Sequence, residues 1–389
     1  MRAKTKILIY TSMPWSHSNR KEFTLELGRQ LQDAEIVVID RPSAIFPNIF
    51  RPSKWWQFRR DDRLTKEIHG VTVIRPTTIF HDQITSISTT PFGAFLNNLL
   101  IKRFLRKHTT ILEGTGKRIL WLYEQISWPI STVADWDEIV WEIFDDYTLH
   151  SDGTTRQKWA KQEHQMIRIS TVCFTLTSKL KEKYCNLTKN VHVIGNGFDE
   201  FQMSNARPPK ELPSYLSSNK IRVGFVGRVR SWIDFRLLES IVIDNPNYDF
   251  IFIGPVDNDV ISELKNLRRH SNFHYFGPVS KSEGYWHMKN MNIGFVPYVR
   301  SSFTAAVKPI KMVEFLAAGI PVVTTLDADI EAYKPFVRTV TSPKDFKSSV
   351  IYFEQQSNNS EMCKELVKND RWSEKVKFVK RTLRLNQQN

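Results

Sequence analysis

The segment from residue 308 to residue 325 contains the residue types whose spacing best suits the binding of a phosphorylated ligand. Pro309 fits the first position of a helix, and the Gly-Ile-Pro run ten residues later would end that helix. The backbone N–H groups at the start of a helix bind anions. Lys308 and Lys311 add positive charge to the first turn, where the helix dipole disfavours it unless an anion compensates. We therefore expect a phosphate group at this helix start.

Glu314 follows Lys311 by three residues and so lies on the same face of the expected helix. Its carboxylate could accept two hydrogen bonds from the adjacent hydroxyls of a ribose. The alternative is an amphipathic core helix whose lysines are incidental. We favour a binding site because both lysines oppose the dipole.

A second candidate for phosphate binding lies at residues 221–230, where an apolar run ends in Gly227 and Arg228. Glycine permits a close approach of backbone and ligand, and a guanidinium suits bidentate contact with phosphate. Arg230 is a further candidate for the same role. Either arginine could instead be exposed to solvent in an ordinary loop.

Two adjacent carboxylates, Asp145 and Asp146, follow the strand-like run at residues 138–144. Crowding of like charges raises the pKa of one carboxyl toward a value that suits a general base. We predict Asp145 as the base and Asp146 as the second candidate. The alternative is an acidic cap on the following loop, or a salt bridge.

The polar loop at residues 12–20 follows the first apolar run of the chain and contains Trp15, His17 and Arg20. These side chains are candidates for binding an acceptor or a phosphate group.

Strand-like runs alternate with helical patterns almost throughout, which predicts parallel sheets built from βαβ units. We expect an α/β fold with two Rossmann-like, doubly wound domains that face a central cleft. The expected domains are residues 1–203 and 221–370, joined by a linker at 204–220 that holds three prolines and four serines. A last helix within residues 371–389 would cross back to the N-terminal domain.

The 308–325 segment resembles the donor-binding helix of the GT-B glycosyltransferases, with the pattern K-P-x-K-x-x-E-x-x-A-x-G-x-P-V-V. It is most similar to bacterial surface-polysaccharide enzymes of the teichuronic-acid and xanthan glucuronosyltransferase types. Residues 193–199 resemble a turn of the same family. In many retaining relatives a second glutamate precedes the ribose-binding one by eight residues, but Ala306 occupies that position here. The stereochemical outcome therefore stays open.

The resemblance implies transfer of a sugar from a nucleotide diphosphate donor, most simply a UDP-sugar, to a lipid-linked or growing polysaccharide of the capsule or cell envelope. It assigns donor binding to five residues: Gly227, Arg228, Lys308, Lys311 and Glu314. No cofactor is expected. Two rivals stay open, a nucleotide-sugar epimerase on the same fold and a catalytically degenerate scaffold.

Metal chemistry is not expected, although two Asp-x-Asp pairs occur, at 257–259 and 327–329. Each follows a strand and precedes helix-forming residues, where aspartate is a preferred cap. The GT-B resemblance also implies catalysis by cationic groups and helix dipoles without a metal.

The net charge of +14 over 389 residues is divided unevenly, with +9 in residues 1–110, −3 in 111–200 and +8 in the rest. Tryptophans and basic residues interleave at 51–63, and a helical face rich in phenylalanine and leucine precedes a basic cluster within 92–107. This combination suits an anionic membrane surface or single-stranded nucleic acid. We expect the membrane, because no nucleic-acid-binding module is recognisable.

Three scattered cysteines suit a reducing compartment, and neither a signal peptide nor an apolar run of 18 residues is apparent. We expect a cytoplasmic protein that is peripheral at the inner face of the cell membrane.

Overall fold

The computed structural model describes residues 4–11, 14–15, 18, 20–45, 65–66, 68–81, 85–149, 154–188, 190–301, 304–327, 329–356 and 359–385. The chain divides into two compact units. The first unit comprises Met1–Ile194 together with Lys375–Asn389, and the second unit is Gly195–Glu374.

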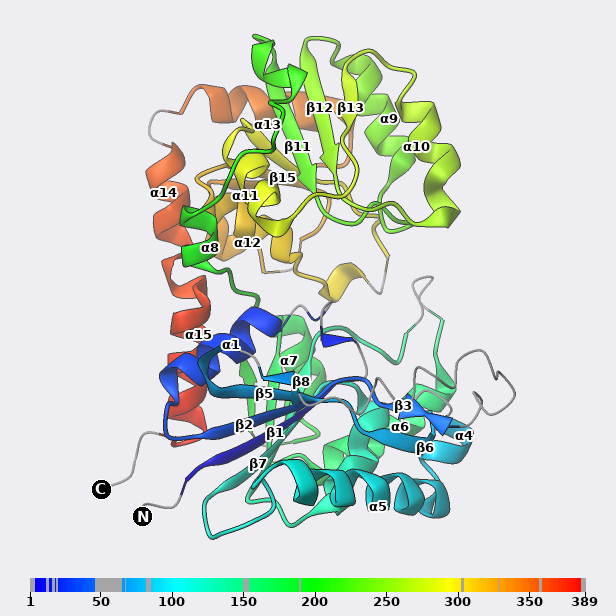
Figure 1. Ribbon diagram of the computed structural model, residues 1–389. Coiled ribbons are helices and arrows are strands. Elements are labelled where there is room, and N and C mark those ends of the chain that lie inside the picture. The colour runs from blue at the N-terminus through cyan, green and yellow to red at the C-terminus, as the bar shows by residue number, and fades with distance from the viewer. Residues whose placement is uncertain are drawn as a thin grey trace. The chain divides into compact units, whose positions relative to one another are not determined.

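The first unit is built on an eight-stranded sheet in the order β10-β9-β8-β7-β1-β2-β5-β4 (Figure 1). Every pair is parallel except β4 with β5. The order reverses between β1 and β7, which makes this the topological switch point of the unit. The strands are β1 (Lys6–Tyr10), β2 (Glu35–Ile39), β4 (Thr65–Lys66), β5 (Val71–Ile74), β7 (Arg118–Leu122), β8 (Glu138–Ile143), β9 (Val172–Thr175) and β10 (Val191–Val193).

Two helices of the first unit begin at capping residues that the sequence provides. In α5 (Pro91–His108), proline occupies the first turn and the Thr90 side chain accepts a hydrogen bond from the Gly93 backbone N–H. In α7 (Ser178–Cys185), Thr177 caps the Leu180 N–H in the same way. The remaining helices are α1 (Lys21–Gln30), α6 (Gln157–Ile169), the short α4 (Thr85–Ser88) and the 3-10 segment η4 (Gln125–Val133).

The second unit is an all-parallel sheet in the order β13-β12-β11-β14-β15-β16, a Rossmann-like arrangement whose switch point lies between β11 and β14. Its strands are β11 (Ile221–Val226), β12 (Tyr248–Ile253), β13 (Phe273–Tyr275), β14 (Ile293–Val296), β15 (Val322–Thr324) and β16 (Val337–Thr339). Its helices are α8 (Glu200–Ser204), α9 (Phe235–Asp244), α10 (Ile261–Leu267), α11 (Lys281–Lys289), α12 (Ile310–Ala317), α13 (Pro343–Glu354) and α14 (Asn359–Leu366).

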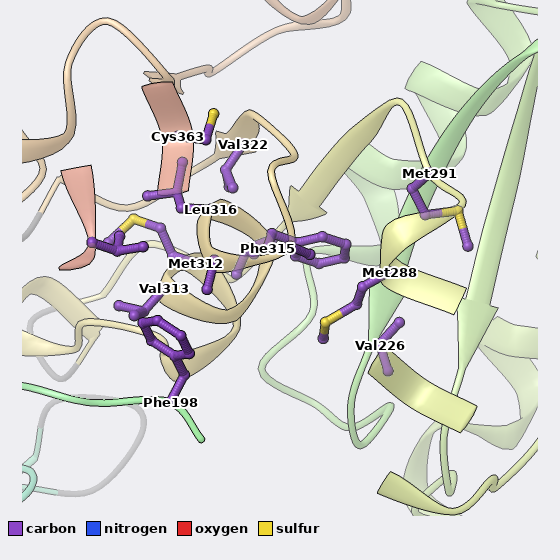
Figure 2. Close-up of a cluster of buried hydrophobic side chains, with 14 of the residues drawn as sticks. Phe198, Val226, Met288, Met291, Met312, Val313, Phe315, Leu316, Val322 and Cys363 are labelled. Atoms are coloured by element: carbon purple, nitrogen blue, oxygen red, sulfur yellow. The ribbon is translucent and has the colours of Figure 1, made fainter. Parts of the chain in front are cut away.

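Helix α12 is fixed in the core of the second unit by its apolar face. Figure 2 shows Met312, Val313, Phe315 and Leu316 among buried side chains from other elements. A β-carbon on Gly294 of β14 would lie 2.5 Å from the Phe315 ring, so the glycine lets the helix pack closely on the strand. The start of α12 is thereby held at the carboxyl edge of the sheet.

The stretch expected as a linker, residues 204–220, lies inside the second unit. Tyr215 within it is 2% exposed, and its hydroxyl bonds to Nδ1 of His287 on α11 at 2.6 Å. The prolines and serines predict an irregular backbone for residues 204–220, but they do not predict that the segment packs against the second unit.

The last helix returns to the first unit as expected. It is α15 (Trp372–Thr382), and the chain from Lys375 onward belongs to the first unit. The Lys380 ammonium donates to the Gln30 carbonyl at 3.1 Å, and Phe378 lies 6.2 Å from Phe174, centroid to centroid. Within the described ranges, no helix combines the length and apolar character needed to cross a bilayer.

Candidate active site

Each of three neighbouring strands of the second unit, β11, β12 and β13, is followed within two residues by a glycine. The Gly227 N–H after β11 donates to the Ile253 carbonyl at 2.8 Å, and the Gly254 N–H after β12 donates to the Gly277 carbonyl at 2.7 Å. Gly254 has φ +136°, and a β-carbon there would lie 2.0 Å from the Gly227 carbonyl oxygen. Glycine therefore allows the backbones of neighbouring strand ends to approach closely, and these strand ends form the glycine floor beside the switch point of the second unit.

Replacing Gly254 tests how strictly this floor requires glycine. We expect Gly254→Ala to lower the free energy of unfolding by about 2–4 kcal/mol, because backbone strain and the clash with Gly227 add together. Gly277→Ala is the control, since Gly277 also has positive φ (+68°) but nothing lies within 4 Å of its β-carbon position. Urea denaturation measures both. Equal losses in the two variants would contradict the close approach.

Lys311 lies against this floor. Its Cε is 3.5 Å from the β-carbon position of Gly227. Its ammonium pairs with Oε2 of Glu314 at 2.6 Å, and Oε1 of Glu314 accepts the Tyr285 hydroxyl at 3.1 Å. The lysine side chain is 26% exposed, whereas that of Glu314 is 3% exposed. A buried carboxylate thus holds an accessible cation at the start of α12.

Two arginines flank the same strand ends. Arg228 bonds through Nη1 to Oδ1 of Asp257 at 2.7 Å, and Nε of Arg230 is 3.7 Å from Oδ2 of the same carboxylate. Arg230 also lies over the Trp232 ring at 4.2 Å. Both arginine side chains are more than a third exposed, although Nε of Arg230 is buried, so Asp257 orients side chains that still reach solvent.

The two Asp-x-Asp pairs thus have different partners from those expected. Asp257 binds arginine, which corrects the expectation that it caps the following helix; a 3-10 turn, Asn258–Val260, precedes α10 there. Asp327 bonds to Arg300 at 2.9 Å. Among the described residues, no group of three or more potential metal ligands comes together.

Tyr298, which follows β14, connects these charges. Burial raises the pKa of the Tyr298 phenol to about 12, with Arg230 lowering it and Glu314 raising it. Both groups therefore act electrostatically on one phenol. Tyr298 therefore lies within electrostatic range of both Arg230 and Glu314.

Lys308 behaves differently from Lys311. It is 9% exposed, and its ammonium donates to the Tyr333 hydroxyl at 2.6 Å, which in turn donates to Asp370 at 2.7 Å. Its carbonyl accepts from the Asn196 side chain at 2.7 Å. Lys308 therefore anchors the loop before α12, and its contact with a donor stays a prediction.

Asp145 and Asp146 take different environments at the end of β8. Oδ1 of Asp146 bonds to the Lys183 ammonium at 2.8 Å and accepts the Thr148 N–H at 3.2 Å, so it forms the salt bridge that was the alternative to a base. Burial raises the pKa of the Tyr147 phenol, and the charge of Asp145 raises it further. The Asp145 backbone carbonyl accepts the Tyr147 N–H at 3.0 Å.

Arg20 is buried with a partner distant in sequence. Its Nε is 2.6 Å from Oε1 of Glu142, whose Oε2 accepts the Trp121 indole N–H at 2.9 Å. Arg20 is 2% exposed and Glu142 is 0% exposed. Burial raises the pKa of Glu142, which Arg20 and the indole oppose. The pair supports the carboxyl end of β8, and a role of Arg20 in binding an acceptor or phosphate stays a prediction.

Trp15 and His17 are the other two candidates of the first loop. Trp15 is 6% exposed, and its backbone N–H donates to Oδ1 of Asp40 at 2.8 Å. His17 lies outside the described residues, as does the tryptophan-rich stretch 51–63.

A polar segment at the switch point of the first unit, directly after β7, was not predicted from the sequence. Gln125 is 1% exposed and Ser127 is 3% exposed, yet in the described part of the chain neither the Gln125 amide nor the Ser127 hydroxyl has a hydrogen-bond partner. Ser127 lines a cavity of about 30 Å³ with Tyr10 and Asn97. Buried polar groups of this kind require a water or a ligand hydroxyl. The sequence feature that could have indicated this segment is the polar run that follows the apolar strand β7.

No protein-family model matches the chain. Over 242 residues the chain is 28% identical to a candidate teichuronic acid biosynthesis glycosyltransferase, TuaH, of Bacillus subtilis (strain 168); the match covers 59% of this chain and 61% of the relative. The chain thus spans about three fifths of that relative's length.

Solved structures with the same fold cover nearly the whole chain at low sequence identity. Sucrose-phosphate synthase of Thermosynechococcus elongatus has a TM-score of 0.72 at 12% identity, with 98% of each chain covered. Alr3699/HepE of Anabaena, solved in complex with UDP, has a TM-score of 0.66 at 13% identity, with 98% of this chain and 100% of that chain covered. The chain therefore has the fold of the GT-B glycosyltransferases and is similar in sequence to a candidate glycosyltransferase of teichuronic acid biosynthesis.

Proposed function

We propose that the chain is a glycosyltransferase that moves a sugar from a UDP-sugar to a hydroxyl of a lipid-linked or growing bacterial polysaccharide. The observation that carries the proposal is the accessible Lys311 ammonium at the start of α12, beside the glycine floor of the second unit. The glycosyltransferase relative and the UDP complex of a protein with the same fold support it.

The second unit would bind the donor. Arg228 and Lys311 suit the diphosphate, because Arg228 is an exposed cation at a strand end and Lys311 is a partly exposed cation at a helix start. Glu314 is paired with Lys311, and this pair would separate when the donor binds. The Glu314 carboxylate would then accept a hydrogen bond from a ribose hydroxyl, and the Lys311 ammonium would bind a phosphate oxygen. As the sugar leaves, negative charge grows on the nucleotide diphosphate, and the fixed cations stabilise it without a metal ion.

The first unit would bind the acceptor at its own switch point. Asp145 is the proposed base that takes the proton of the acceptor hydroxyl as its oxygen bonds to the anomeric carbon. The unsatisfied Gln125 and Ser127 would form hydrogen bonds with acceptor hydroxyls. A lipid-linked acceptor would bring the protein to the cytoplasmic face of the cell membrane as a peripheral protein.

The test of the donor site is Lys311→Ala. We expect the affinity for UDP to fall by about 10- to 100-fold, the usual weight of a charge-assisted hydrogen bond. Isothermal titration calorimetry with UDP measures the change. Lys364→Ala is the matched control, because Lys364 forms the same i,i+3 pair with Glu361, at 2.7 Å, on the exposed face of α14.

Three results would decide against the proposal. Unchanged UDP affinity in Lys311→Ala would remove the observation that carries it. Conversion of a UDP-sugar to an isomer without release of UDP would indicate the epimerase instead. Binding of UDP by a chain that releases no UDP from any UDP-sugar, with membrane acceptors present, would indicate the scaffold.

A further inference from the structure

Helix α5 exposes large apolar side chains along one face. Phe92 is 68% exposed, Phe95 is 62% exposed and Leu99 is 54% exposed. They follow one another at spacings of three and four residues, so they lie on one side of the helix over two turns. The helix has 18 residues and a length of about 27 Å.

The same face becomes basic toward the end of the helix. At about 100° per residue, Arg103 and Arg106 fall with Phe92, Phe95 and Leu99 inside an arc of about 80°. Both arginines are exposed, and the helix contains no Asp or Glu. The outer face of α5, defined by these five residues, is thus an apolar stripe that continues into a basic one.

The opposite face fixes this orientation. Ala94, Ile101 and Leu105 are buried there. The Asn97 side-chain oxygen accepts the backbone N–H of Phe80 at 2.9 Å, and the Asn98 amide donates to the Pro129 carbonyl at 2.6 Å. Rolling the helix to bury its phenylalanines would break these buried bonds, so the outer face stays exposed within the first unit.

We propose that the outer face of α5 docks on a bilayer surface rich in anionic phospholipid. The apolar residues enter the boundary between headgroups and acyl chains, while the two guanidinium groups bind lipid phosphates. The inference rests on the proposed function, in which the acceptor is lipid-linked, and it identifies the surface that contacts the membrane.

Charge favours a bilayer over a second copy of the chain. A symmetric pair of α5 helices would bury four arginines that have no acidic partner on the face, at a large desolvation cost. An anionic leaflet instead supplies phosphates along the whole stripe.

The test measures sedimentation of the whole protein with vesicles of phosphatidylcholine, with or without half phosphatidylglycerol. We expect wild-type binding to the anionic vesicles that weakens as salt rises. The triple variant Phe92→Ser, Phe95→Ser, Leu99→Ser should lower the partition coefficient by at least about tenfold. Arg103→Glu with Arg106→Glu should abolish the preference for anionic vesicles.

The matched control removes equally exposed apolar side chains from the second unit. Phe201, Leu212 and Ile243 are 70%, 67% and 57% exposed, and their triple serine variant should bind vesicles as wild type does. Equal binding by the α5 variant and wild type would overturn the proposal. A dimer that is seen in light scattering and is abolished by the α5 substitutions would also overturn the proposal. Binding of single-stranded nucleic acid that the same substitutions abolish would overturn it too. UDP affinity, measured in parallel, should be unchanged in every variant, so a failure of the donor site is distinguished from a failure of docking.

Discussion

Asp145→Asn is expected to lower the rate of sugar transfer by about 10²- to 10⁴-fold, the usual contribution of a general base, with UDP affinity unchanged. Asparagine keeps the shape of the side chain but cannot take the proton of the acceptor hydroxyl. The measurement is release of UDP from a UDP-sugar in the presence of membranes that carry the acceptor.

The neighbouring carboxylate provides the control for this prediction. Asp146→Asn weakens the ion pair with Lys183 and should lower the free energy of unfolding. At a temperature where this variant stays folded, its rate of sugar transfer should stay close to that of the wild type. The pH profile separates the two roles, because loss of a base removes the acidic limb of the profile and a structural change does not. Transfer at the wild-type rate by folded Asp145→Asn would eliminate Asp145 as the base.

Arg20→Met is expected to destabilise the first unit by about 3–5 kcal/mol, because it leaves the Glu142 carboxylate buried without its cation. Removing both charges in Arg20→Met with Glu142→Leu should recover most of that loss. Urea denaturation followed by tryptophan fluorescence measures the change.

A more exposed pair on α1, the helix that follows Arg20, is the control for the buried pair. Arg29 bonds to Glu26 at 3.2 Å on α1, and Arg29→Met should cost about 1 kcal/mol or less. A double variant no more stable than Arg20→Met would show that the destabilisation does not come from the uncompensated Glu142.

The fold was predictable because its signals are local. The alternation of apolar runs with amphipathic helices gives the parallel sheets, and α5 (Pro91–His108) contains the helical face and basic cluster predicted within 92–107. The position of α12 could be predicted because Pro309, Lys311 and Gly319, which mark its start and its end, lie within a dozen residues of one another. The unit boundary after Ile194 was not predictable, because it depends on which partners residues 195–220 find in three dimensions.

The site was predictable only where its residues are close in sequence. Lys311 and Glu314 were placed together correctly, since three residues along a helix separate them. Arg20 and Glu142 are 122 positions apart, so their buried ion pair could not be predicted from the polar loop that contains Arg20. The requirement for glycine at position 254 likewise could not be predicted, because it arises from the close approach of the Gly227 backbone, 27 residues earlier in the chain.

Binding of a UDP-sugar donor without a metal ion is tested by calorimetric titration of the wild-type protein with UDP, GDP, dTDP and CMP in buffer that contains EDTA. We expect UDP to bind with the highest affinity, and we expect removal of metal ions to leave this affinity unchanged. Absence of UDP binding, or binding that appears only when a divalent metal is restored, would contradict it.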